Sequence, residues 1–255
     1  MTHAGTSLDK IEAVGIVALL ASALFIAFPG LDLAISRLFG GVDDFPLRAS
    51  VAWNAVRDAM IGLTDGAMLV VIAMLLAGLV WPGCQVLRTR VLAFALASYA
   101  LGPGLLVNAV LKSHSGRPRP WNVDLFGGDA VFSPLFDFAG QCRSHCSFVS
   151  GEASALATMA TILLLVAVPL LPRRNRVAAR IGIIAVAVAG SLLRVAFGAH
   201  FLSDVVFAWL VSVPIVLALH AAFGIGRLNT PLATTAGVPA RRLHDRNLDD
   251  RHALS

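Results

Sequence analysis

The sequence predicts an all-α membrane protein that crosses the bilayer six times. Hydrophobic residues make up 57% of the 255 residues and charged residues only 14%, whereas a soluble chain carries about a quarter charged residues. The charges are also unevenly spread, because six stretches of about 20 residues contain almost none. Continuous apolar stretches of this length form membrane helices, while a β-barrel needs alternating polar and apolar residues.

The expected helices follow one another along residues 1–226, which are interpreted as one membrane domain. The spans are predicted near residues 11–31, 64–87, 91–111, 151–172, 181–199 and 203–226. One basic residue, Arg194, interrupts the fifth span. Residues 227–255 are rich in Thr, Pro, Gly and charge, and we expect them to form a disordered tail.

Basic residues between the spans predict the orientation of the chain. Most of the 20 Lys and Arg residues fall in the N-terminal segment, the loops near residues 82–90 and 172–180, and the tail. Cytoplasmic segments are enriched in Lys and Arg, so both termini are expected in the cytoplasm. The net charge of +5 is attributed to this topology signal and to attraction for anionic lipid, not to nucleic-acid binding.

The segment after the first span contains another expected helix. Asp44 and Pro46 are typical of a helix start, and several apolar residues between Leu47 and Leu63 fall near one helical face. Two interpretations fit this pattern, an amphipathic helix on the membrane surface or a short helix packed against the ends of the bundle.

Three basic residues on the outer side lie directly against the ends of spans. Lys112 and Arg119 follow the third span, and Arg194 lies near the end of the fifth. The predicted topology brings all three to one membrane face, where their mutual repulsion requires an anion between them. Arginine binds phosphate oxygens with two parallel hydrogen bonds and lysine acts as a point charge. The sequence therefore predicts a phosphate pocket.

The start of the fourth span strengthens this prediction. Ser150 and Gly151 precede it, and the exposed N–H groups and positive dipole end of a helix N-terminus bind anions. A possible nucleophile lies nearby in the expected fold. His200 and Asp204 are four residues apart, so on a helix the carboxylate would accept from one imidazole nitrogen and leave the other free to attack phosphorus.

Together these motifs resemble the three-part signature of the type 2 phosphatidic acid phosphatases. The matching segments are Lys112 to Pro120, the Ser150-Gly151 pair, and Arg194 to Asp204. The resemblance extends from about residue 60 to residue 225. It implies a metal-independent, cofactor-free phosphatase of lipid and isoprenoid phosphates with its active site at the periplasmic edge of a bacterial inner membrane. The roles it implies are phosphate binding by Lys112, Arg119, Ser150, Gly151 and Arg194, nucleophilic attack by His200 through a phosphohistidine intermediate, and support of His200 by Asp204.

Two positions depart from the family pattern. Leu193 precedes Arg194 where the family usually has a serine, which is peripheral to the chemistry. The second departure affects the chemistry directly. Glu152 stands where the family has the histidine that protonates the leaving oxygen. A carboxylic acid can fill this role if burial raises its pKa, although nearby cations oppose that change. The alternatives are protonation by His145, His114 or water. In a further alternative, Glu152 only pairs with Arg119 or Arg194.

Two cysteines, Cys142 and Cys146, fall in the outer segment before the Ser150-Gly151 pair. An outer pair in a cysteine-poor chain predicts a disulfide that stiffens the approach to the phosphate site, with two free thiols as the alternative. A zinc site is not expected there, because only three ligands crowd into five residues.

The substrate is expected to be a phosphorylated membrane lipid. The resemblance admits lipid A, phosphatidylglycerol phosphate, phosphatidic acid and undecaprenyl diphosphate, and the altered second motif favours a lipid A-like glycolipid with a specialised leaving group. Two other functions fit the same residues. They are a lipid phosphotransferase and a catalytically silent lipid-phosphate transporter or binding protein. The sequence does not predict an oligomeric state.

Overall fold

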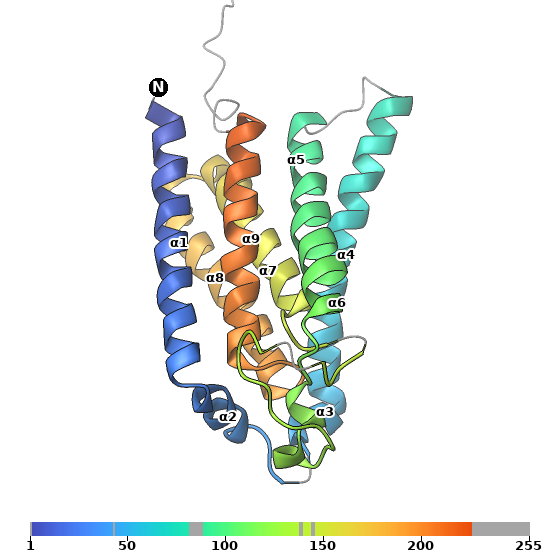
Figure 1. The fold of residues 1–255 in the computed structure, drawn as a ribbon. Coiled ribbons are helices and arrows are strands. Elements are labelled where there is room, and N and C mark those ends of the chain that lie inside the picture. The colour runs from blue at the N-terminus through green and yellow to red at the C-terminus, as the bar shows by residue number, and fades with distance from the viewer. Residues whose placement is uncertain (1, 43, 82–88, 138–139, 144–145, 226–255) are drawn as a thin grey trace, which may run out of the picture.

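The computed structural model of the chain has the predicted all-α architecture (Figure 1). It describes residues 2–42, 44–81, 89–137, 140–143 and 146–225. Within these ranges the chain forms helices joined by loops, together with an isolated β-bridge between Val123 and Ala130. The tail expected at residues 227–255 lies outside the described residues.

Six helical segments of the described chain are long and apolar enough to cross a membrane, so the six-span prediction is confirmed. The segments are Asp9–Ala27 within α1 (Thr2–Ala27), α4 (Val51–Val80), Thr89–His114, Gly151–Leu170, α8 (Arg173–Ala196) and α9 (Leu202–Ala222). The third is composed of α5 (Thr89–Tyr99), the π-helical η2 (Ala100–Leu111) and α6 (Lys112–His114). The fourth is composed of α7 (Gly151–Ile162), η5 (Leu163–Ala167) and η6 (Val168–Leu170).

The second span begins earlier than predicted. It starts at Val51 instead of near residue 64, and Ser50 caps it by accepting a hydrogen bond from the backbone N–H of Trp53. No proline interrupts the sequence from there to Val80, so the helix continues for 30 residues. The prediction of a separate amphipathic helix over residues 47–63 is therefore wrong. In that part of the described chain, only the single turn α3 (Pro46–Ala49) stands apart from α4.

Helix α9 packs against both α1 and α7, and α7 also contacts α8 and η2. Small side chains on α7 and α9, including the fully buried Ala153 and Ala208, belong to the core at this contact and permit close approach of the helix backbones. The Ser154 and Ser212 hydroxyls lie 2.7 Å apart across the same contact, which satisfies both of them inside the bundle.

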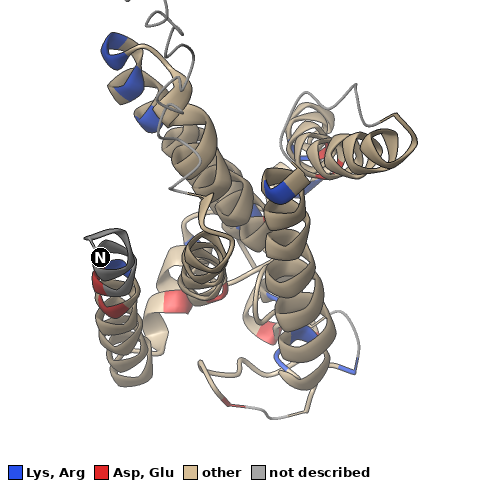
Figure 2. Ribbon diagram, turned by 90° about the horizontal axis from the view of Figure 1, so that it is seen from above, with Lys and Arg blue, Asp and Glu red and all other residues tan. Residues whose placement is uncertain are grey.

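One end of the bundle collects the segments predicted to form the site. The end of α6, the start of α7, and the turn between α8 and α9 meet there, with α2 (Gly30–Arg37) and α3 at the same end (Figure 1). The backbone N–H of Trp121 donates to the carbonyl of Gly198 at 3.1 Å, which ties the loop after α6 to the α8–α9 turn. Charged residues elsewhere lie mainly near helix ends (Figure 2).

Candidate active site

Lys112, Arg119 and Arg194 come together at this end of the bundle, within electrostatic range of one another. Lys112 begins α6, Arg119 lies in the loop that follows, and Arg194 lies in the last turn of α8. Arg194 is only 5% exposed, and burial lowers the pKa of Arg119, with the carboxylates of Glu152 and Asp204 opposing that change. Three clustered cations, of which Arg194 is buried and the other two are half-buried, could hold a multiply charged anion between them.

The N-terminus of α7 lies directly beside Lys112. A methyl group placed on Gly151 would be 3.3 Å from Nζ of Lys112 and 2.7 Å from Oδ1 of Asn108. Glycine is therefore the residue that lets the lysine ammonium approach the start of the helix. Ser150 caps α7, because its hydroxyl accepts from the N–H of Ala153 at 3.3 Å. The helix start and the ammonium group thus present positive charge to the same place.

Glu152 is held between two arginines. Its Oε1 accepts a hydrogen bond from Nη2 of Arg57 at 3.0 Å, and its Oε2 lies 3.2 Å from Nε of Arg194. The pairing with Arg194 was one of the alternatives that the sequence left open. Arg57 was not predicted in the site, because the early start of α4, which brings Arg57 to this end, was not expected.

The two other histidines considered as proton donors lie differently. His114 is exposed, and its Nδ1 contacts the carbonyl of Val110 on its own helix at 2.7 Å. His145 lies outside the described residues.

His200 is buried in the turn just before α9 and is only 2% exposed. Its Nδ1 lies 2.7 Å from the backbone carbonyl of Ser147. A carbonyl only accepts hydrogen bonds, so Nδ1 carries the proton and Nε2 keeps its lone pair. Burial lowers the pKa of His200 to about 4, with Asp204 opposing the change and the charges of Arg194 and Arg119 adding to it. The imidazole is therefore neutral near pH 7.

The expected hydrogen bond between His200 and Asp204 is absent. Nδ1 of His200 lies 3.8 Å from Oδ2 of Asp204, beyond hydrogen-bonding distance. The prediction assumed that both residues lie on one helix, but α9 begins at Leu202, so His200 precedes it. Ser147 connects the two instead, because its carbonyl accepts from His200 and its hydroxyl donates to Oδ2 of Asp204 at 2.5 Å.

The Asp204 carboxylate has further partners that the sequence did not reveal. Oδ1 accepts from Nη1 of Arg117 at 2.6 Å, and Oδ2 accepts from the N–H of Phe201 at 2.8 Å. Arg117 in turn bonds to Asp32 of α2. A usable signal for Arg117 was its place between a glycine and a proline, two residues before Arg119. The signal for Asp32 was an acidic side chain directly after the first span.

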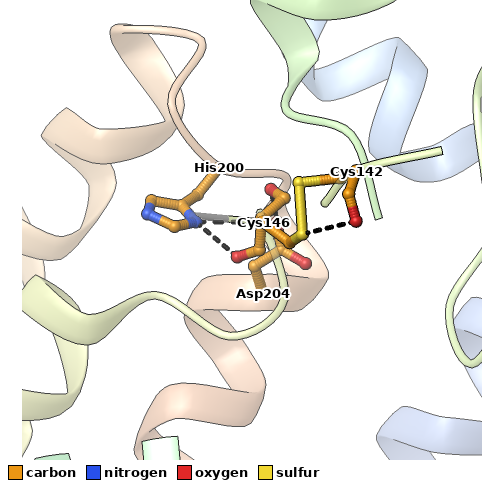
Figure 3. The surroundings of a disulfide bond; sticks show 5 residues. Cys142, Cys146, His200 and Asp204 are labelled. Atoms are coloured by element: carbon orange, nitrogen blue, oxygen red, sulfur yellow. Dashed lines mark hydrogen bonds and ion pairs between the residues drawn. A yellow bond between two sulfur atoms is a disulfide. The ribbon is translucent and has the colours of Figure 1, made fainter. Parts of the chain in front are cut away.

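Cys142 and Cys146 form a disulfide in the structure, with their Cα atoms 5.6 Å apart. Cys146 is buried and directly precedes Ser147, the residue that contacts both His200 and Asp204. The disulfide therefore lies beside the histidine (Figure 3).

Known proteins share this sequence and this fold. The PAP2 superfamily profile matches residues 90–225. Lipid A 4'-phosphatase from Rhizobium leguminosarum is 37% identical over 214 residues, which cover 78% of this chain and 90% of the relative. The enzyme of the same name from Francisella tularensis subsp. novicida is 33% identical over 210 residues, which cover 75% and 86%.

A solved structure resembles the fold as well. It is the transmembrane PAP2-type phosphatidylglycerolphosphate phosphatase from Bacillus subtilis, with a TM-score of 0.51 and 19% sequence identity over 85% of this chain and 96% of that one. The fold, the site and these matches define a membrane lipid phosphatase, which confirms the predicted enzyme class. More narrowly, the chain belongs to the PAP2 superfamily, as the three motifs had indicated.

Proposed function

We propose that this protein hydrolyses the 4'-phosphate monoester of lipid A or of a closely similar glycolipid. The names of its relatives support this substrate. The observation that carries the proposal is the hydrogen bond from Nδ1 of His200 to the Ser147 carbonyl at 2.7 Å. It fixes a neutral imidazole whose Nε2 lone pair is free for attack, in electrostatic range of Arg119 and Arg194.

In the proposed mechanism, the phosphate group binds among Lys112, Arg119 and Arg194, at the N-terminus of α7. Nε2 of His200 attacks phosphorus, the P–N bond forms and the bond to the sugar oxygen breaks. The leaving oxygen takes up a proton. Water then attacks the phosphohistidine, the P–N bond breaks and inorganic phosphate leaves. The cations and helix dipole stabilise the charge that develops on the phosphoryl oxygens in both steps.

Asp204 stabilises the positive charge that the imidazole gains on attack. The carboxylate lies 3.8 Å from Nδ1, so it acts on His200 by charge and through Ser147, not by a direct hydrogen bond. A histidine oriented by a neighbouring group and supported by a carboxylate follows the same logic as the His–Asp half of a serine protease triad.

Glu152 is the proposed donor of the proton to the leaving oxygen. In the structure its ion pairs with Arg57 and Arg194 engage the ionised carboxylate, which cannot donate. A bound phosphate supplies negative charge that competes for Arg194. In the proposed step, the protonated carboxyl group of Glu152 transfers its proton to the leaving oxygen, and the water that attacks the phosphohistidine later returns a proton to it.

The proposed setting is a bacterial inner membrane with both termini in the cytoplasm and the site at the periplasmic edge. The basic residues in the loops near 82–90 and 172–180 support this orientation. A site at the end of the spans suits a substrate whose acyl chains stay in the membrane while its phosphate reaches the cations.

The test uses purified protein in detergent with EDTA and a panel of lipid A, phosphatidic acid, phosphatidylglycerol phosphate and undecaprenyl diphosphate. Phosphate release from lipid A is expected, and mass spectrometry identifies the phosphate lost. His200→Ala should abolish release. Unchanged activity in His200→Ala would overturn the mechanism. Radiolabel recovered in a second lipid instead of in free phosphate would identify a phosphotransferase, and lipid binding without any release would identify a silent binding protein.

A further inference from the structure

Arg117 occupies an unusual place for a guanidinium, because it is only 2% exposed and lies next to the candidate site. Its five N–H donors meet several buried acceptors. Nε donates to the Ser133 carbonyl at 3.0 Å, Nη1 to Asp204 at 2.6 Å and to the Ser203 hydroxyl at 2.8 Å, and Nη2 to Asp32 at 2.8 Å. Rotation of the Arg117 side chain would break several of these hydrogen bonds at once, so its guanidinium group is held in one orientation.

The aromatic ring of Phe201 adds a further constraint. The guanidinium carbon of Arg117 lies 4.4 Å from the centre of that ring. Phe201 follows His200 directly in the chain, and its backbone N–H donates to Asp204. Arg117 therefore contacts the segment that follows His200 at two places, the ring of Phe201 and the carboxylate of Asp204.

Asp32 is the second anchor of this arrangement. It is 1% exposed, and its Oδ1 accepts from the backbone N–H of Ser203 at 2.9 Å in the first turn of α9. Its Oδ2 accepts from both Arg117 and the Ser203 hydroxyl. A carboxylate at a helix N-terminus is favoured by the helix dipole. Asp32 thus docks α2 onto the start of the helix that carries Asp204.

The charges of this network bear on the site. Arg117 stands between two carboxylates, so it compensates part of the charge of Asp204, and Asp32 compensates part of the charge of Arg117. Buried ion pairs add little to stability when compared with apolar residues of similar size. What the network does supply is one fixed orientation of the Asp204 carboxylate, with Oδ2 directed to Ser147 and Phe201.

We propose that Arg117 and Asp32 are positioning residues for catalysis, which hold Asp204 and Ser147 in the arrangement that orients His200. This inference rests on the proposed function. It also assigns part of the catalytic unit to α2, since Asp32 lies outside the region matched by the superfamily profile, residues 90–225. The N-terminal helices then contribute to the reaction and not only to membrane anchoring.

The experiment measures phosphate release from lipid A by Arg117→Lys, Arg117→Met and Asp32→Asn, with kcat, KM and the pH dependence of kcat. We expect kcat to fall at least about tenfold and KM to change by less than about threefold, because the phosphate-binding cations are untouched. Arg37→Met and Asp44→Asn, which alter an exposed arginine and an exposed carboxylate, are the matched controls and should behave as wild type.

The pH profile separates positioning from a merely structural role. The charged groups that face His200 are Asp204 on α9, Arg194 on α8 and Arg119 in the loop after α6. Without Arg117, the charge of Asp204 is less compensated and favours the imidazolium form of His200. The fall of kcat at low pH, here called the acid limb of the profile, should therefore move to higher pH in Arg117→Met. Without the Asp32 charge, Arg117 acts more strongly on the site, so the limb should move to lower pH in Asp32→Asn. The substrate phosphate titrates identically in all these enzymes.

Opposite shifts with reduced kcat, and partial recovery in Arg117→Lys, support the proposal. Wild-type kcat and pH profiles in Asp32→Asn and Arg117→Lys would overturn it. Recovery of none of the three variants as a folded, monodisperse protein would overturn it as well, in favour of a structural role. Activity of wild type and loss in His200→Ala are measured in parallel, so failure of the proposed function is recognised separately.

Discussion

The carboxylate of Glu152 lies 3.2 Å from Nε of Arg194 and does not stand alone in the site. A second arginine, Arg57, binds its other oxygen. In the proposed mechanism the carboxylate takes the place of the family's histidine, because Arg194, which pairs with it here, is also one of the groups proposed to bind the phosphate. A proton donor and a residue that only holds Arg194 differ in how their loss depends on the leaving group.

The first prediction concerns Glu152→Gln, which removes the proposed proton donor but keeps the shape of the side chain. We expect kcat for lipid A to fall about 10²- to 10⁴-fold, the usual contribution of general acid catalysis. An aryl phosphate with an activated leaving group departs without protonation, so its hydrolysis should fall less than about tenfold.

The control for this variant is Asp58→Asn, which alters an exposed carboxylate that contacts Arg57 from the other side. It should retain wild-type rates with both substrates. Equal losses for lipid A and the aryl phosphate in Glu152→Gln would show that Glu152 acts by holding Arg194.

The second prediction concerns the protonation of His200. Burial lowers its pKa to about 4, below the usual value of about 6.5. The imidazole therefore stays neutral and nucleophilic as the pH falls through 6.5, and it becomes charged only near pH 4. In the unfolded chain the same histidine takes up its proton at a higher pH of about 6.5. The contribution of His200 to the free energy of unfolding therefore declines as the pH falls below 6.5, by about 1.4 kcal/mol per pH unit down to the folded pKa.

An NMR titration of protein labelled at histidine tests this sign. The His200 resonance is identified by its loss in His200→Gln, and its midpoint should lie well below 6.5. A midpoint at or above 6.5 would contradict the interpretation of a buried, neutral nucleophile.

The third prediction concerns the close approach at the start of α7. Gly151→Ala places a methyl group 2.7 Å from Oδ1 of Asn108 and 3.3 Å from Nζ of Lys112, so the Asn108 side chain must shift and the ammonium group must yield by a few tenths of an ångström. We expect kcat/KM to fall at least about tenfold, since a misplacement of about 1 Å can cost far more. Gly182→Ala, at a helical glycine with open space around it, should leave kcat/KM unchanged. Equal behaviour of the two variants would refute the assignment of Gly151.

The sequence predicted the six-span architecture and the family, because apolar length and short fixed spacings are local properties. The start of the second span was predicted too late. The parts it missed depend on contacts between distant segments. Arg57 and Glu152 are 95 residues apart in the sequence, and Arg117 and Asp32 are 85 residues apart. No local sequence pattern predicts either ion pair. The predicted hydrogen bond between His200 and Asp204 is absent for a different reason. A separation of four residues brings two side chains within hydrogen-bonding distance only where both lie on the helix, and α9 begins after His200.

The last prediction concerns the disulfide between Cys142 and Cys146. A crosslink that closes so short a loop stabilises by about 2 kcal/mol in the chain-entropy estimate. The loop ends at Cys146, and the next residue, Ser147, supplies the carbonyl that orients His200. Removing the crosslink in Cys142→Ser/Cys146→Ser therefore loosens the support of the nucleophile as well as the fold. We expect a lower thermal midpoint in detergent together with a several-fold lower kcat, while KM stays near the wild-type value because the phosphate-binding cations are carried by other segments.

Cys84→Ser, at the remaining cysteine of the sequence, is the control and should preserve both quantities. Alkylation and mass spectrometry of the wild-type protein, with and without prior reduction, should show two thiols that become reactive only after reduction. Free thiols at both positions in unreduced protein would contradict the disulfide. A wild-type kcat in the double variant would show that the disulfide does not contribute to catalysis.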